Sequence, residues 1–447
     1  MPQNPNKVSL ASNASRLGAL SLVGTLMLLV SGVVAARDEA ASDPKNNRSE
    51  LRPQTSDGHA LMKGTRNAYT VIPSRFADRA PQAPTATFIV TYNGFSSQAR
   101  TAFQDAIDQW ASFISSPGPI RVQANWVSLQ PGQLGSAGSN GVERNFLGAP
   151  EDNTWYPQAL ADRLAGADVS PGEFDIIANF NKDESDWFFG TNGNTPAGKF
   201  DFVTVVMHEL AHGLGYAGPM RWDDGDGGIA ECNGNAGQGC FGTGNPVSPN
   251  IFDRFTENGS GKGLITYGNP SAALGNQLIS DNLFYDSANA KDKNGGQRPK
   301  LYAPNPFENG SSYSHVDEDV FGPGDPDSLM TPRLDPAESI HDPGDIALCM
   351  FEDHGWETSA DCVDGPAQGP EVLYNQQLGC AGFAAPAFFW TNGNWNVEPA
   401  DDFVVPAGQN WSIDTIVVRG AWSTGGGPIN GARVSIYRDG SSPSNTK

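Results

Sequence analysis

The most constraining stretch of this chain is residues 201–216, where an apolar run leads directly into the pattern His-Glu-x-x-His. The run predicts a helix, because Asp201 can cap its start and Gly213 and Gly215 can end it. A helix fixes the directions of the polar side chains that it carries, so the chemistry of this stretch follows from their spacing.

Two histidines and one glutamate on the predicted helix form a metal-binding pattern. His208 and His212 are four residues apart, so their imidazoles project from one face about one turn apart. That spacing suits two ligands of one zinc ion. Glu209 points about 100° around the helix from His208, which places it beside the metal. There it can act as a general base and take a proton from a water molecule at the zinc ion.

This helix leaves the third ligand open. A catalytic zinc site normally has three protein ligands and one position for water. A later glutamate is one alternative, as in thermolysin-like enzymes, but Gly215 argues against it because it can break the helix and turn the chain under the metal. The other candidates are the four remaining histidines: His59, His315, His341 and His354.

Residues 208–215, His-Glu-Leu-Ala-His-Gly-Leu-Gly, resemble the first part of the zinc-binding motif of the metzincin metalloproteases. The usual third histidine of that motif would fall at Gly218. The leishmanolysin-like metzincins carry a large insertion there and supply the histidine later. Residues 311–318, Ser-Ser-Tyr-Ser-His-Val-Asp-Glu, are similar to that later segment, and residues 328–332, Ser-Leu-Met-Thr-Pro, to the Met-turn that follows it. The resemblance covers about residues 86–356.

The resemblance implies a zinc endopeptidase in which His315 is the third ligand and Met330 lies in the turn beneath the metal. His315 precedes Met330 by 15 residues, so one loop can deliver both. Asp317 and Glu318 are close enough in sequence to hold the far ring nitrogen of a ligand histidine. The substrates implied are proteins or peptides, bound in extended form along an edge strand above the cleft.

Two further comparisons with the family concern the order of the histidines along the chain and the residue that follows the Met-turn. The rival ligands His341 and His354 both follow Met330, which is the wrong order for the family. A metzincin tyrosine often stands two residues after that methionine. Pro332 stands there in this chain, so no tyrosine is assigned to the oxyanion.

The charge balance disfavours two classes of partner. Lys and Arg number 28 against 50 Asp and Glu, a net charge of −22, and such a surface repels nucleic acids and anionic membranes. Asp223, Asp224 and Asp226 share one loop and can bind Ca²⁺ through carboxylate oxygens. Because the spacing of an EF-hand is absent, solvated loop acids are the stronger interpretation.

Residues 1–36 have the pattern of an export signal. A positively charged start precedes an apolar stretch, and Val34-Ala35-Ala36 offers small residues for cleavage. We therefore expect a secreted protein with no membrane span once the signal is removed. The alternative is an uncleaved N-terminal anchor, because the apolar stretch approaches the length of a membrane span.

The cysteines fit an exported protein, in which disulfides are the default. Cys232 paired with Cys240 would staple a Gly-rich loop, and Cys349 paired with Cys362 would tie a helix to the chain that leaves it. Cys380 is left over.

Patterning predicts a metalloprotease domain of α+β class, metzincin-like by the resemblance, over residues 85–362, with the insertion at 217–314. The predicted strands are residues 88–92, 120–129 and 174–180, and the other predicted helices begin at Ser96 and span residues 343–356. Residues 37–84 are polar and Pro-rich, which predicts a propeptide or linker with little core of its own. This segment contains no cysteine, so it cannot supply a thiolate as a temporary ligand of the metal. Its one histidine, His59, could serve as such a ligand.

Residues 371–447 alternate apolar and polar side chains between Gly/Pro-rich turns, which predicts a second, all-β domain. It is shorter than the about 100 residues of a typical β-sandwich, so we expect it to be incomplete in this sequence. Two other functional classes stay open. One is a non-catalytic binding protein in which Phe388, Phe389, Trp390 and Trp395 form a sugar-binding face, although such aromatics more often fill a core. The other is a zinc hydrolase of a non-peptide amide.

Overall fold

A computed structural model describes residues 59–76, 85–225, 232, 235–242 and 247–362, together with the backbone of seven further strands. The chain forms two compact units. One spans residues 41–369, and the other combines residues 1–40 with residues 370–447.

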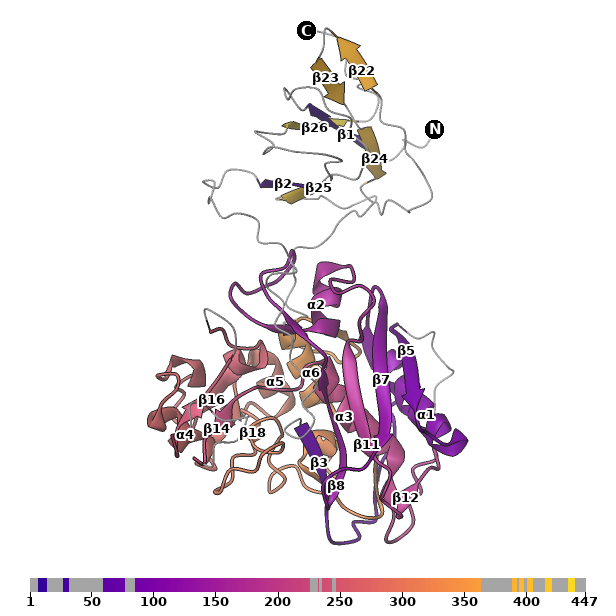
Figure 1. Ribbon diagram of the computed structural model, residues 1–447, viewed down its shortest axis with the longest axis vertical. Coiled ribbons are helices and arrows are strands. Elements are labelled where there is room, and N and C mark those ends of the chain that lie inside the picture. The colour runs from indigo at the N-terminus through magenta and orange to yellow at the C-terminus, as the bar shows by residue number, and fades with distance from the viewer. Residues whose placement is uncertain are drawn as a thin grey trace. The chain divides into compact units, whose positions relative to one another are not determined.

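The larger unit is a mixed α+β structure built on a six-stranded sheet in the order β19-β3-β8-β11-β7-β5 (Figure 1). The strands are β3 (His59–Lys63), β5 (Thr87–Asn93), β7 (Pro119–Val127), β8 (Gln133–Ser139), β11 (Ile176–Asn181) and β19 (Arg333–Leu334). Strands β5, β7 and β11 are parallel. Strand β8 runs antiparallel to both β11 and β3, and β3 is parallel to β19.

Two helices, α1 (Ser97–Phe113) and α3 (Phe202–Leu214), pack against the sheet and against each other. Ser96 caps α1 by accepting a hydrogen bond from the amide of Ala99. The apolar face of α1 is buried, and the indole of Trp110 donates to the carbonyl of Met207 at 3.0 Å. Because α3 is buried along its whole length, the His-Glu-x-x-His pattern lies inside the core.

The insertion folds as a group of short elements at one side of the sheet, away from α1 (Figure 1). They are β14 (Arg221–Trp222), β15 (Gly239–Cys240), β16 (Thr256–Asn258), α4 (Ala272–Leu278), β17 (Leu283–Tyr285), α5 (Ala288–Lys293) and β18 (Lys300–Leu301). Strands β16, β17 and β18 form a small antiparallel sheet, and β14 pairs with β15.

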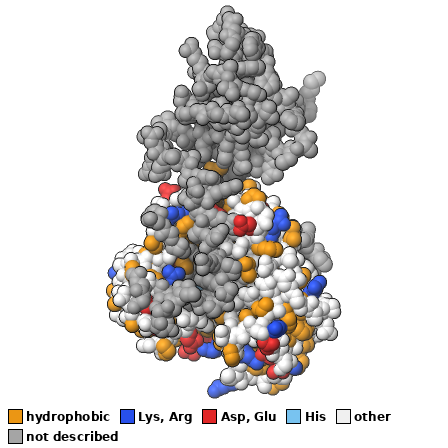
Figure 2. Space-filling view, in the orientation of Figure 1, with side chains coloured by type: hydrophobic (Ala, Val, Ile, Leu, Met, Phe, Trp, Pro, Cys, Tyr) orange, Lys and Arg blue, Asp and Glu red, His pale blue; other side chains and the backbone are white. Residues whose placement is uncertain are grey.

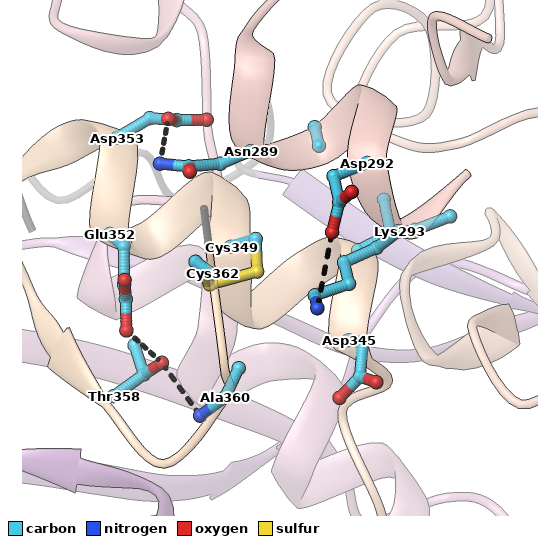
Figure 3. Close-up of a disulfide and its surroundings, with 12 residues drawn as sticks. Asn289, Asp292, Lys293, Asp345, Cys349, Glu352, Asp353, Thr358, Ala360 and Cys362 are labelled. Atoms are coloured by element: carbon cyan, nitrogen blue, oxygen red, sulfur yellow. Dashed lines mark hydrogen bonds and ion pairs between the residues drawn. A yellow bond between two sulfur atoms is a disulfide. The ribbon is translucent and has the colours of Figure 1, made fainter. Parts of the chain in front are cut away.

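Both predicted disulfides are present. Cys232 is bonded to Cys240. Cys349, on α6 (Asp345–His354), is bonded to Cys362 in the chain that leaves the helix (Figure 3). Cys380 lies outside the described residues.

Several further contacts surround the second disulfide. The amide of Asn289 on α5 donates to the carboxylate of Asp353 on α6 at 2.8 Å (Figure 3). Below the disulfide in Figure 3, the hydroxyl of Thr358 donates to Glu352 on α6 at 2.8 Å. These bonds fix α6 to α5 and to the chain that follows it.

The remaining elements connect the sheet, the helices and the insertion. They are β4 (Thr70–Ile72), β6 (Ile114–Ser115), β9 (Val142–Glu143), β10 (Tyr156–Pro157), α2 (Gln158–Ala165), β12 (Trp187–Phe188), β13 (Phe200–Asp201), β20 (Glu338–Ile340), β21 (Glu357–Thr358), and the 3₁₀ helices Phe252–Phe255, Leu264–Thr266 and Ser328–Met330.

Two expectations from the sequence need correction. Within residues 37–84, predicted as a propeptide or linker, the pattern indicated no strand, whereas β3 joins the main sheet and β4 pairs with β20. Ala60 and Leu61 of β3 are buried. The strand was not predicted because the residues around it are mostly polar. Gly213 does not end α3. It lies inside the helix, where an added Cβ would meet Ile176 of β11 at 2.4 Å, and Gly215 ends the helix with φ 119°.

In the smaller unit, the described strands pair antiparallel. Strand β1 (Lys7–Asn13) lies between β24 (Ala400–Val404) and β26 (Arg433–Arg438), and β2 (Met27–Ser31) pairs with β25 (Thr415–Arg419). Strand β22 (Phe388–Thr391) pairs with β23 (Asn394–Val397), in a register that sets Trp390 opposite Trp395. The side chains of this unit lie outside the described part, so the export signal and the aromatic face stay predictions.

Two properties bear on partners. Among the described residues, no helix has the length and apolar character that crossing a membrane requires. Acidic and basic side chains are interspersed over the described part of the face shown in Figure 2. The excess of acidic residues is therefore not gathered into a single patch on that face.

Candidate metal centre

Three imidazoles converge inside the larger unit. The Nε2 atoms of His208, His212 and His315 lie 3.0, 3.1 and 3.2 Å from one another. The exposed fraction of each side chain is 1% or less. Two of these residues come from α3 and the third from the end of the insertion, about 100 residues later in the chain. The structure thus brings together the three histidines that the resemblance implied.

The other ring nitrogen of each histidine is held by a backbone carbonyl. The acceptors are Leu329 for His208 (2.7 Å), Tyr216 for His212 (2.7 Å) and Ser311 for His315 (2.6 Å). A carbonyl oxygen can only accept, so each Nδ1 carries a proton and each Nε2 carries a lone pair. Burial lowers the pKa of His208 to about 4 and holds the pKa values of His212 and His315 well below their ordinary range, so all three rings are neutral at pH 7.

Neutral imidazoles in this arrangement can hold a metal ion. Three lone pairs that face one another at 3.0–3.2 Å repel, and a cation between them removes the repulsion. Nitrogen ligands at about 2.0–2.1 Å from a tetrahedral Zn²⁺ lie about 3.3 Å apart, so the observed spacing fits with small adjustments. Among the described residues, this is the one buried group of histidine, cysteine or carboxylate side chains that meets the spacing of a metal site.

The helix that carries two of these histidines is fixed at both ends. The carboxylate of Asp201 accepts hydrogen bonds from the amide and the hydroxyl of Thr204, at 3.2 and 2.7 Å. Gly215 turns the chain at the other end, and the amide of Tyr216 then donates to the carbonyl of Ala211. This turn also aims the carbonyl of Tyr216 at His212.

Position 218 explains how the insertion returns to the metal centre. The backbone of Gly218 exchanges two hydrogen bonds with the hydroxyl of Ser314, at 3.2 and 3.1 Å. A Cβ at position 218 would lie 2.0 Å from the ring of Tyr313. No side chain fits there, so the chain passes close by and His315, next to Ser314, lies where it can complete the site.

Glu209 lies on α3 beside the three histidines, with its side chain fully buried. Its Oε1 accepts a hydrogen bond from the amide of Leu61 at 3.3 Å. Burial raises the pKa of Glu209 well above its ordinary value, and backbone hydrogen bonds oppose that rise. Gly135 of β8 also lies against this side chain, since an added Cβ there would be 2.7 Å from Oε1. The carboxylate is therefore seated against a glycine.

Met330 ends a 3₁₀ helix, Ser328–Met330, and its side chain is buried in the core. The preceding carbonyl, that of Leu329, is the acceptor for His208. The amide of Val316 donates to the carbonyl of Met330 at 3.0 Å, which joins this turn to the segment that carries His315. The turn therefore braces two of the three histidines through its backbone.

Asp317 and Glu318 do not hold a histidine, contrary to expectation. His315 uses the carbonyl of Ser311, and Asp317 pairs with Lys300 at 3.1 Å. Burial raises the pKa of Glu318 to about 7. The ring of His315 reaches the carbonyl of Ser311 because the chain turns back within four residues. The positions of Asp317 and Glu318 in the sequence do not indicate this turn.

The rival histidines have other partners. His341 bonds to the carboxylate of Asp201 at 2.6 Å. His354 lies in the core beside the hydroxyl of Tyr285 at 3.2 Å, and burial lowers its pKa to about 3. His59 stacks on His212 with the ring centroids 4.7 Å apart. It lines a cavity that also reaches His212, which the sequence alone did not indicate.

The proposed calcium ligands also have a structural explanation. The carboxylate of Asp223 accepts hydrogen bonds from the amides of Gly225 and Asn235, both at 3.0 Å, so it organises its own loop. Asp226 lies outside the described residues. The described part of this loop contributes no residue to a metal-binding group.

Comparisons with known proteins cover part of this region. A family model described as SPBPB7E8-like matches residues 148–226, which include α3 and thus His208 and His212. The match covers less than half of the chain. The comparisons with curated proteins and with solved structures found no match.

Proposed function

We propose that this chain is an exported zinc endopeptidase of the metzincin type, with His208, His212 and His315 as the zinc ligands and Glu209 as the general base. The observation that carries the proposal is the convergence of three imidazole lone pairs, with the buried carboxylate of Glu209 next to His208 in sequence on the same helix. Zn²⁺ is the best fit, because it favours neutral imidazole ligands, three of them in a catalytic site.

When Zn²⁺ is bound, it supplies Lewis-acid chemistry, which polarises a carbonyl group and makes water more acidic. Glu209 then accepts the proton of the attacking water and passes it to the nitrogen of the leaving amine. Its buried position favours this role, because desolvation raises its pKa and makes its carboxylate a stronger base. Gly135 leaves room for the carboxylate, because an added Cβ there would lie 2.7 Å from Oε1.

A peptide substrate is favoured over other amides by the strand beside the site. Strand β8 passes Glu209 at Gly135 and pairs on its far side with β11. Its other side forms a backbone ladder with β3, an extended segment of the chain itself, and strand addition binds peptides of varied sequence through the same kind of ladder. The two disulfides agree with an exported protein, since an oxidising compartment allows both to persist.

The test is elemental analysis of the purified protein together with a casein-cleavage assay. We expect about one zinc per chain, with cleavage that a chelator abolishes and added zinc restores. Glu209→Gln should keep its zinc and its fold but lose activity by about 10²–10⁴-fold, because the amide has nearly the same shape but cannot act as a base. Zinc-loaded protein that cleaves neither casein nor varied peptides would refute the proposal and favour a binding protein.

A further inference from the structure

A cavity lies beside the metal centre, next to His212. It is lined by the C-terminal half of β8, from Ser136 to Ser139, and by the chain that follows α3, residues 217–221. Residues just before His315 also line it. The cavity therefore borders the same strand and one of the same histidines as the proposed reaction.

The cavity contains one cationic side chain. Among the described residues that line it, Arg221 is the one Lys or Arg, and none is Asp or Glu. His59 and His212 also line the cavity, but burial lowers the pKa of both, so their rings are neutral at pH 7. A negatively charged group that enters the cavity is therefore attracted, and a positively charged one is repelled.

The guanidinium of Arg221 has few partners. Its Nε is buried without a hydrogen-bond partner, and its Nη2 donates to Sγ of Cys240 at 3.8 Å, which is a weak acceptor. In the described part of the chain, no carboxylate lies within ion-pair distance of Arg221. The charge of Asp253 acts on it from farther away, because it opposes the lowering of the Arg221 pKa by burial.

Asp253 is occupied by other groups. Its Oδ1 accepts a hydrogen bond from the hydroxyl of Tyr313 at 2.8 Å, and its Oδ2 accepts one from the amide of Asn250 at 2.9 Å. Asn250 lines the cavity, and its side-chain oxygen is buried with no hydrogen-bond partner among the described residues. The cavity thus has two polar side chains that lack partners, although buried polar groups are normally paired.

The position of Arg221 is fixed by its neighbours. Arg221 lies on β14, opposite Cys240 of β15, and Cys240 is bonded to Cys232. The disulfide therefore holds the backbone next to Arg221. A guanidinium whose position is already fixed loses less conformational entropy when it binds. Its planar shape matches a carboxylate, with which it can form two parallel hydrogen bonds.

We propose that Arg221 determines substrate specificity by binding the carboxylate of an aspartate or glutamate side chain on one side of the bond that is cut. This inference rests on the proposed endopeptidase function. From Gly135, the cavity follows β8 in one direction only, toward Ser139, so a substrate that passes Glu209 along β8 brings residues from one side of the cut bond to the cavity. The side-chain oxygen of Asn250 can accept a hydrogen bond from an N–H group of the same substrate.

The experiment measures kcat/KM of the purified full chain for fluorogenic peptides of one sequence. A single glutamate is moved through the positions on both sides of the cut bond, and each peptide is compared with its glutamine counterpart. We expect the wild type to favour glutamate by about 10- to 100-fold at positions on one side only, the range of a hydrogen bond to a charged group. This comparison within the wild type needs no variant.

Variants of Arg221 then test the residue itself. Arg221→Gln should remove the preference for glutamate, mainly through KM, because side-chain binding is lost. Arg221→Glu should reverse the preference in favour of lysine at the same positions. Arg100→Gln is the matched control: it removes the same charge from an exposed residue of α1 that does not line the cavity, and it should keep the preference.

A peptide's terminal carboxylate has the same chemistry as an acidic side chain. The scanned peptides therefore have amidated C-termini, and one further peptide is compared with a free and an amidated C-terminus. If only the free C-terminus raises kcat/KM, the proposed acidic side chain is wrong.

The remaining outcomes separate this inference from the proposed function. If glutamate and glutamine peptides are cleaved equally well at every position, or if Arg221→Gln keeps the preference, this inference is wrong while the proposed function stands. If no peptide is cleaved, the proposed function is wrong. The anisotropy of the same peptides, labelled with a fluorophore and mixed with zinc-loaded Glu209→Gln, then tests Arg221 without catalysis. Equal binding of glutamate and glutamine peptides would overturn this inference as well.

Discussion

Gly135 offers a sharp test of how Glu209 is positioned. In Gly135→Ala, the new Cβ would lie 2.7 Å from Oε1 of Glu209, 2.8 Å from Cγ and 3.0 Å from Cδ. Ordinary contacts begin near 3.4 Å, so the carboxylate must move by about 0.7 Å. Misplacing a catalytic group by 1 Å can cost about 10²-fold, so we expect kcat to fall by roughly 10- to 100-fold. The cost in folding free energy should be about 1 kcal/mol, at the low end for an overpacked site, because the glutamate side chain can move.

The assay compares zinc content, thermal unfolding and hydrolysis of a fluorogenic peptide after the rate has become constant. KM should change little, because proton transfer is affected more than binding. Gly138→Ala is the matched control: Gly138 lies on the opposite face of the same strand, and an added Cβ there meets nothing within 4 Å. If Gly135→Ala holds its zinc and keeps the kcat of the wild type, the packing of Glu209 against Gly135 of β8 does not position the carboxylate for the reaction.

Three further predictions follow from the described contacts. His315→Ala should lose most of its zinc because two imidazoles remain, whereas His354→Ala should keep it; elemental analysis that shows full zinc in His315→Ala would place the third ligand elsewhere. Burial alone would lower the pKa of His341, but the hydrogen bond and charge of Asp201 raise it overall, so this pair stabilises the fold fully below pH ~6.5 and less as the pH rises through the raised value. Urea unfolding at pH 6 and pH 8 should show this loss in the wild type, and an equal loss in His341→Gln would contradict it. Cys362→Ser opens a loop that spans 13 residues and should lower the free energy of unfolding by about 3 kcal/mol, and an unchanged urea midpoint would argue against a structural role for this disulfide.

The sequence by itself determined the elements whose signals are local. The cap at Asp201 and the glycine at 215 bound α3 as predicted, and the helical spacing put His208 and His212 on one face. The apolar period after Ser96 gave α1. These succeed because capping and side-chain direction depend on residues within a turn or two.

Strand β8 escaped sequence reasoning, although it borders the site. Its sequence, Gln-Leu-Gly-Ser-Ala-Gly-Ser, lacks the β-branched and aromatic residues by which strands are found. Gly135 weakens the strand signal for a structural reason, since Glu209 occupies the space that a side chain would take. The short segment β3 was hidden in the same way by the polar residues around it.

Only the tertiary structure decided how the metal centre is completed. His315 meets α3 because the insertion packs Ser314 against Gly218, and no local pattern encodes a contact between residues so far apart. The tautomers of the three histidines are set by carbonyl groups of Leu329, Tyr216 and Ser311, whose directions depend on backbone turns. The strand that covers Glu209 is likewise fixed by pairing partners on both sides, because hydrogen bonds between strands are made by backbone groups that every sequence shares.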